Sequence, residues 1–199
     1  YDMNRFSALV PGTDKPLVVI TTSKASERKE SQPASKMGYQ NLYEAQLIAD
    51  VVSDIVEAQS EDKKATFLEK IEDNIGIISA YGAQVRLIRE CLKKKKLDIK
   101  DSQIRSMVAS LDSFQGQERP LILYSLTRST TYKKPDKGRV GFMKELRRLN
   151  VAFTRCQKQL VIVGDIDYLT ECMNMETIQD EEYSWPCAQQ EEMAFISQE

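Results

Sequence analysis

Two arginines near residue 150 have the chemistry and the spacing to act together on a phosphate. Arg148 and Arg155 stand seven positions apart, which on a helix of about 3.6 residues per turn places them within about 20° of each other. An arginine held on a rigid element can neutralise the charge that develops on a phosphoryl group during its transfer. The sequence contains no histidine, so a general base would have to be a carboxylate, lysine, tyrosine or cysteine.

Two other segments combine an apolar strand with a polar turn whose side chains are suited to ligand binding. The segments are 75–84 and 109–118, and their candidate residues are Tyr81, Gln84, Ser113, Gly116 and Glu118. Loops at the carboxyl ends of parallel strands line the ligand crevice of an open α/β sheet. We therefore expect both turns to lie at such a crevice, with Arg155 pointing toward it.

Short apolar runs alternate with amphipathic stretches, which predicts an α/β fold with a parallel sheet flanked by helices. The predicted strands are 17–21, 75–79, 107–111, 121–125 and 160–164, and the predicted helices are 41–58, 83–96 and 142–156. The last helix has one apolar stripe, formed by Phe142, Leu146, Leu149, Phe153 and Cys156. A helix that buries such a stripe is rigid, and Arg155 is expected on its exposed face.

Charge is distributed unevenly although the net charge is only −2. Residues 128–158 contain ten Lys or Arg against two acids, whereas residues 165–199 contain ten acids and no Lys or Arg. A concentration of positive charge is typical of a phosphate-rich partner. We expect one domain over 1–172, with a mobile loop at 24–38, followed by an acidic tail at 173–199.

Several classes of protein are disfavoured by the composition. No apolar run reaches the roughly 20 residues that a membrane helix needs, so no membrane partner is expected. The four cysteines are widely spaced, which argues against a metal site. Scattered cysteines are typical of reduced thiols, and we expect a cytoplasmic location, or a nuclear one in a eukaryote.

The three segments together resemble motifs IV, V and VI of superfamily 1 helicases, in the branch of the up-frameshift and senataxin-like enzymes. The resemblance is carried by Tyr81 after its strand, by Asp112-Ser-Phe-Gln-Gly-Gln-Glu118 and by Arg147-Arg-Leu-Asn-Val-Ala-Phe-Thr-Arg155. An Asn-x-x-Glu-Ala element typical of the branch begins at Asn41. Two departures are Ser79-Ala80, where Thr-Pro is commoner, and Cys156, where Ala is usual.

The resemblance implies a RecA-like domain, the second of two in a helicase motor. It makes Arg155 the arginine finger that reaches the γ-phosphate of ATP. It places Gly116 and Glu118 at the nucleotide, with Arg148 as a possible assistant. It also places Tyr81, Gln84 and Ser113 near a single strand of DNA or RNA, without distinguishing the two.

The phosphate-binding half of an ATPase is missing from the chain. There is no Gly-x-x-x-x-Gly-Lys-Ser/Thr loop and no strand ending in the paired acids that hold magnesium. The resemblance implies that the first RecA-like domain of the same protein binds most of the ATP and Mg²⁺, so the isolated chain should be inactive. The alternative is a helicase-derived binding or regulatory module without catalysis; the presence of Gly116, Glu118 and Arg155 favours the enzyme.

Each candidate residue also has a purely structural interpretation. Gly116 could serve only a left-handed turn, Glu118 could face solvent, and Tyr81 could be a packed aromatic at a strand end. Asn41 and Glu44 could cap or brace the long helix. Arg155 could form an ordinary surface salt bridge.

Overall fold

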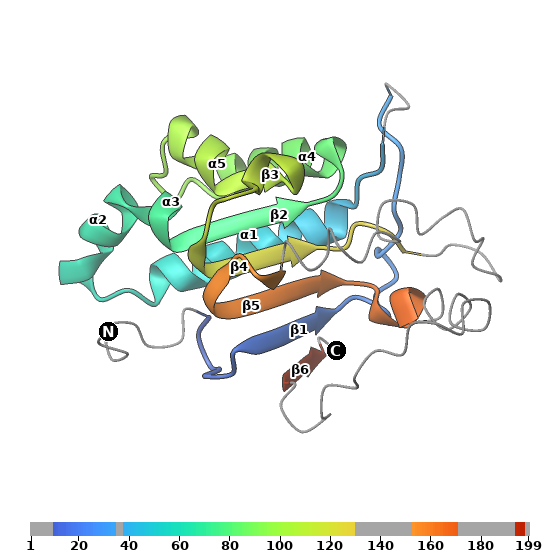
Figure 1. The fold of residues 1–199 in the computed structure, drawn as a ribbon, viewed down its shortest axis with the longest axis horizontal. Helices are drawn as coiled ribbons and strands as arrows, with labels where there is room; N and C mark the ends of the chain where they lie inside the picture. Colours follow the sequence, from blue (N-terminus) through green and yellow to red (C-terminus); the bar gives the residue numbers. More distant parts are fainter. Residues whose placement is uncertain (1–9, 35–37, 130–152, 171–193, 198–199) are drawn as a thin grey trace.

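The computed structural model describes residues 10–34, 38–129, 153–170 and 194–197 of the chain. Its elements are β1 (Leu17–Thr21), α1 (Leu42–Glu57), α2 (Glu61–Glu69), α3 (Ile71–Asn74), β2 (Ile75–Ser79), α4 (Gly82–Lys94), α5 (Asp101–Met107), β3 (Val108–Ser110), the 3-10 turn η2 (Asp112–Phe114), β4 (Arg119–Ser125), β5 (Cys156–Gly164) and β6 (Ala194–Ser197). The strands form one sheet in the order β3-β2-β4-β5-β1-β6, and every pairing is parallel. The predicted parallel α/β fold is confirmed (Figure 1).

The predicted strands agree with the structure to within a few residues, and β1 and β2 have the predicted bounds. The predicted helix 142–156 is wrong at its carboxyl end. Phe153 is helical, but the next two residues form a turn and Cys156 already begins β5. Cys156 is extended because it pairs with Arg119 of β4. Residues 142–152 lie outside the described part of the chain.

Several elements were not predicted, namely α2, α3, α5, η2 and β6. The helix α2 contains no buried residue, so no apolar stripe marks it in the sequence. β6 pairs with β1, although its residues were assigned to the acidic tail; the domain boundary at 172 stays a prediction. Among the described residues, no helix is long and apolar enough to cross a membrane.

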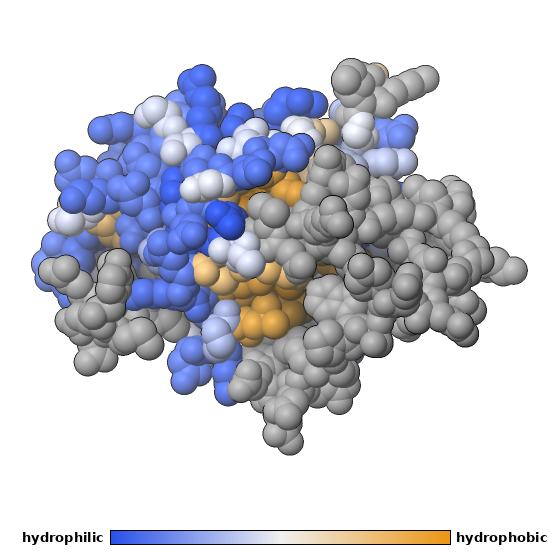
Figure 2. Space-filling model, in the orientation of Figure 1, coloured by the Kyte–Doolittle hydropathy of each residue, from blue (hydrophilic) through white to orange (hydrophobic). Residues whose placement is uncertain are grey.

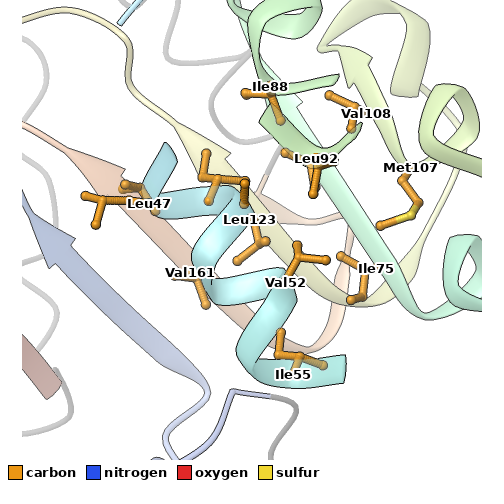
Figure 3. Packing of buried hydrophobic residues seen from close by; sticks show 14 of the residues in the cluster. Leu47, Val52, Ile55, Ile75, Ile88, Leu92, Met107, Val108, Leu123 and Val161 are labelled. Atoms are coloured by element: carbon orange, nitrogen blue, oxygen red, sulfur yellow. The ribbon is translucent and has the colours of Figure 1, made fainter. Parts of the chain in front are cut away.

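One face of the sheet is covered by α1, α4 and α5, which enclose the larger apolar cluster. Figure 3 shows Leu47, Val52 and Ile55 of α1 in one buried cluster with Leu123 of β4 and Val161 of β5. All five side chains are buried. This packing fixes α1 across the middle of the sheet, with its amino terminus near the carboxyl end of β4.

The other face carries a second cluster, because alternate residues of a strand point to opposite sides. Ile122 and Tyr124 of β4 pack here with Phe114, and the Phe153 ring meets the Tyr124 ring edge-on with centroids 6.2 Å apart. Apolar residues gather on this face over β4 and β5 (Figure 2). Burial on both faces is the usual condition of parallel strands, and it explains their nearly continuous apolar sequences.

Candidate functional site

All strands are parallel, so their carboxyl ends lie along one edge of the sheet, the carboxyl edge, and their amino ends along the opposite edge, the amino edge. The turn between β3 and β4 crosses the sheet from the carboxyl edge to the amino edge. It starts at the carboxyl end of β3 and ends at Arg119, the first residue of β4. Phe114 packs this turn against the sheet above Gly76, where a Cβ atom would lie 2.5 Å from Phe114 Cζ. Gly116 and Glu118, which follow Phe114, therefore lie toward the amino edge.

Arg155 lies at the same amino edge, directly before β5. Its carbonyl oxygen accepts a hydrogen bond from Arg119 N at 3.0 Å. The Arg119 guanidinium donates to the Glu118 carbonyl at 2.8 Å and to Gln117 Oε1 at 3.0 Å. Arg119, which was not predicted as a site residue, thus ties the end of the turn to the residue before β5.

The side chains at this edge are open to solvent. Gly116 and Glu118 are exposed and Arg155 is partly exposed; Arg155 Nη2 donates to Thr154 Oγ1 at 3.2 Å. Gly116 has a φ of +82°, and nothing lies within 4 Å of a Cβ atom built there. The left-handed turn alone accounts for this glycine, so its contact with a nucleotide stays a prediction. Arg148 lies outside the described residues.

We expected Gly116, Glu118 and Arg155 to lie at the crevice formed by the loops that follow the strands, and this expectation is wrong. Each crossover of a parallel sheet must return the chain to the amino edge before the next strand begins. A residue that directly precedes β5 therefore lies at the edge opposite the loops that follow the strands. Arg155 is also on a turn and not on the exposed face of a helix.

Gln84 lies at the carboxyl edge, but its side chain is fully buried. Its Oε1 accepts from Asn41 N at 2.7 Å, and its Nε2 donates to Asn41 O at 3.1 Å and to Ser125 Oγ at 3.0 Å. These bonds connect the start of α1 with the end of β4. Contrary to the prediction, Gln84 is not placed to contact a nucleic acid.

Tyr81 and Ser113 keep exposed surface near the same edge. Tyr81 directly precedes α4 and is partly exposed, while Ser113 is exposed and its Oγ lies 2.8 Å from Ser110 Oγ. Ser110 pairs with Ser79 at the carboxyl end of β2, two residues before Tyr81. Both predicted nucleic-acid contacts therefore remain accessible.

A buried carboxyl group, Glu44, lies beneath this edge. It is 0% exposed and accepts hydrogen bonds from Ser125 Oγ and Thr127 N, each at 2.7 Å, and from Asn41 Nδ2 at 3.1 Å. Burial raises the pKa of Glu44 to about 8; the bonds from Ser125 and Thr127 oppose that rise, and two nearby carboxylates add to it. Asn41 Oδ1 accepts from Glu44 N at 3.1 Å, so the interpretation of Asn41 as the cap of α1 is confirmed.

The segment after β1 folds across the carboxyl edge. Arg28 Nε pairs with Asp165 Oδ2 at 3.0 Å, and Arg128 Nε pairs with Glu30 Oε1 at 3.0 Å. Asp165 and Arg128 are buried at 2% and 4% exposure. The described residues of the predicted loop 24–38 are irregular but anchored by these ion pairs, and the mobility of the loop stays a prediction.

Among the described residues, no group of three or more His, Cys, Asp or Glu side chains could hold a metal ion. Cys91 and Cys156 are free thiols, and burial raises the pKa of both. In the described part of the chain, the partly exposed guanidinium of Arg155 is therefore not accompanied by a set of metal ligands.

Comparison with known proteins gives the family. The family described as an AAA domain matches residues 4–167. The chain is 44% identical over 103 residues to DNA polymerase alpha-associated DNA helicase A of Saccharomyces cerevisiae, covering 52% of this chain and 14% of that protein. It is 33% identical over 157 residues to the Schizosaccharomyces pombe protein of that name, covering 77% and 20%. It is 30% identical over 167 residues to probable helicase senataxin of Mus musculus, covering 83% and 6%.

The chain belongs to the AAA domain family. Its parallel sheet is RecA-like, and the resemblance to superfamily 1 helicases of the up-frameshift and senataxin-like branch is confirmed. The chain spans from 6% to 20% of the length of these relatives.

Proposed function

We propose that this chain is the C-terminal motor domain of an ATP-dependent DNA or RNA helicase or translocase. In this proposal Arg155 is the arginine finger, and Gly116 and Glu118 contact the nucleotide beside it. The observation that carries the proposal is the hydrogen bond from Arg119 N to Arg155 O. It joins the motif V turn and the motif VI arginine, which lie far apart in the sequence, at one open edge of the sheet.

The chemistry of this edge suits half of a shared site. A guanidinium group is planar and permanently charged, so it can stabilise negative charge spread over the transferred γ-phosphoryl group. The phosphate-binding loop and the Mg²⁺ ligands belong, in this proposal, to the first RecA-like domain of the same protein. Closure of the two domains on ATP then completes the site and couples hydrolysis to movement along the strand.

Nucleic acid is proposed to bind at the opposite edge, at Tyr81 and Ser113. The surplus of basic residues in 128–158 supports a phosphate-rich partner, and the relatives include proteins named DNA helicase. Because this protein is proposed to act on nucleic acid, its proposed location is the cytoplasm, or the nucleus in a eukaryote. Nothing in the sequence selects between DNA and RNA, because tracking along a strand uses backbone contacts and stacking.

The test is ATP turnover by the full-length protein and by the 199-residue chain alone, each with and without single-stranded DNA or RNA. We expect turnover stimulated by nucleic acid in the full-length protein and none in the chain alone, because the phosphate-binding half is absent. Turnover by the pure chain would contradict the two-domain arrangement. A full-length protein that binds a strand without hydrolysing ATP would instead be a binding module.

A further inference from the structure

Two tyrosines and an arginine from three separate segments meet at the carboxyl edge. Tyr39 lies before α1, Tyr81 before α4 and Arg128 after β4. The two tyrosine rings are nearly perpendicular, at 84°, with centroids 5.6 Å apart. Arg128 Cζ lies 4.0 Å from the centroid of the Tyr39 ring, and Arg128 Nη1 donates to Tyr81 Oη at 3.5 Å.

Arg128 supports the two rings from the protein side. Its side chain is only 4% exposed and its charge is paired with Glu30, so it is not a free cation for a phosphate. Tyr39 and Tyr81 are both partly exposed. The guanidinium therefore stabilises one face of Tyr39 by a cation–π contact, and the aromatic surface that remains available belongs to the tyrosines.

The backbone directly before Arg128 is strained. Thr127 has a φ of +68°, and Arg128 N donates to Leu126 O at 2.7 Å. A bond between residues two apart, around a residue with positive φ, defines the rare and strained form of the γ-turn. For a β-branched residue this conformation persists only when its surroundings impose it, and such outliers concentrate at functional sites.

The surroundings that impose the turn are the buried groups beneath the edge. Glu44 Oε2 accepts from Thr127 N at 2.7 Å, and Asn41 Nδ2 donates to Thr127 O at 3.4 Å. Both peptide groups of Thr127 are thus bound by the start of α1. The same segment carries Tyr39, two residues before Asn41, so one set of contacts fixes both the ring and the arginine beneath it.

We infer that Tyr39 and Tyr81 form a stacking platform for an unpaired base of single-stranded nucleic acid, with Arg128 as a positioning residue. Every base has a π face, so stacking on aromatic side chains tolerates any sequence and suits a motor that moves along a strand. The composition of the chain favours this occupant, because residues 129–158 contain nine Lys or Arg against two acids, which is typical of a phosphate-rich partner. The inference rests on the proposed function and adds Tyr39 and Arg128 to it.

The experiment measures binding of the full-length protein to two single-stranded oligonucleotides of equal length, one of thymidines and one of abasic residues. Both carry the same phosphates, so the ratio of their dissociation constants reports the contribution of the bases, and its change on losing an aromatic ring reports stacking. Tyr39→Leu should reduce the preference for the base-carrying strand by roughly 5- to 150-fold, the range of one lost stacking contact. Tyr39→Phe should retain it, and Arg128→Lys should lower it by a smaller factor.

Tyr43→Leu is the matched control, since Tyr43 is a partly buried tyrosine of α1 that packs against the core and lies outside the platform. It should bind both strands as the unmodified protein does. An unchanged preference in Tyr39→Leu, or an equal loss for both strands, overturns the platform. The proposed function survives either result if turnover is still stimulated by nucleic acid. A full-length protein that binds neither strand refutes both.

Discussion

At the carboxyl edge of the sheet three polar side chains are fully buried and hydrogen-bonded, whereas at the amino edge the Glu118 carboxylate is exposed. Asn41, Glu44 and Gln84 are each 0% exposed, and their polar atoms bind the ends of β4 and α1. Gly116 and Glu118 are exposed at the other edge. Among the described residues, the two edges therefore differ in how far their polar groups are buried.

In the proposed function, this difference would let the two edges of one domain bind two different ligands. A strand that slides requires a surface of constant shape, and buried hydrogen bonds supply that rigidity. A nucleotide shared between two domains requires charged groups that become desolvated only on closure, where their electrostatic effect is greatest. Changes at the amino edge should therefore affect catalysis, and changes at the carboxyl edge should affect stability and nucleic-acid binding.

The largest expected effect is that of Arg155→Ala on ATP turnover in the full-length protein. Loss of an arginine finger should lower turnover by roughly 10³-fold or more. Arg155→Lys should recover little, because an ammonium group cannot reproduce the planar donor set. Turnover is measured at saturating ATP and nucleic acid, together with the affinity for the strand, which should stay nearly unchanged.

Arg105→Ala is the control for this change, since Arg105 is an exposed arginine of α5. It should leave turnover at the level of the unmodified protein. If Arg155→Ala hydrolysed ATP within a few-fold of that level, Arg155 would be a surface residue and the amino edge would lose its assigned role.

The next effect compares the edges directly, by truncating one polar side chain at each. Asn41→Ala removes the cap of α1 and the side-chain amide that donates to Arg28 O, Glu44 Oε1 and Thr127 O, so the free energy of unfolding should fall by roughly 2–4 kcal/mol. Glu118→Ala removes an exposed carboxylate and should change it by no more than about 0.5 kcal/mol. Chemical denaturation of the chain measures both. Equal losses would mean that the edges do not differ in how they are stabilised.

The last expected effect is a pH dependence that belongs to Glu44. The pKa of its carboxyl group rises from 4.5 to about 8 in the folded chain, so between these values the folded state binds a proton that the unfolded state has released. The free energy of unfolding should therefore fall as pH rises through this window, by at most about 1.4 kcal/mol per pH unit. Above about pH 8 Glu44 is ionised in both the folded and the unfolded state, so it causes no further fall in the free energy of unfolding.

Glu44→Gln removes this titration, so its stability should depend less on pH than that of the unmodified chain. The difference between the two unfolding curves, measured from pH 5 to pH 9, isolates Glu44 from other groups. Parallel curves would show that Glu44 is already ionised in the folded chain across this range.

Short-range patterns were sufficient for the strands β1 to β5 and for the family. β1 and β2 have the predicted bounds because continuous apolar runs mark strands buried on both faces. The cap of α1 was also recognisable, since Asn at a helix start is a local signal. The end of the last helix was misjudged at Cys156, because its apolar spacing fits a helix while its pairing with Arg119 makes it a strand.

The sequence by itself determined the α/β class, the residues of motifs IV, V and VI and the absence of a phosphate-binding loop, all of which are written in contiguous residues. Only the tertiary structure decided which edge each motif occupies and which side chains are buried. Gln84 meets Asn41 across 43 positions, and Glu44 meets Ser125 across 81. The spacing of neighbouring residues in the sequence does not indicate contacts between residues that are so far apart. They arise only when parallel strands bring the ends of separate segments together, which is why Tyr39 and Arg128 were found in the structure and not in the sequence.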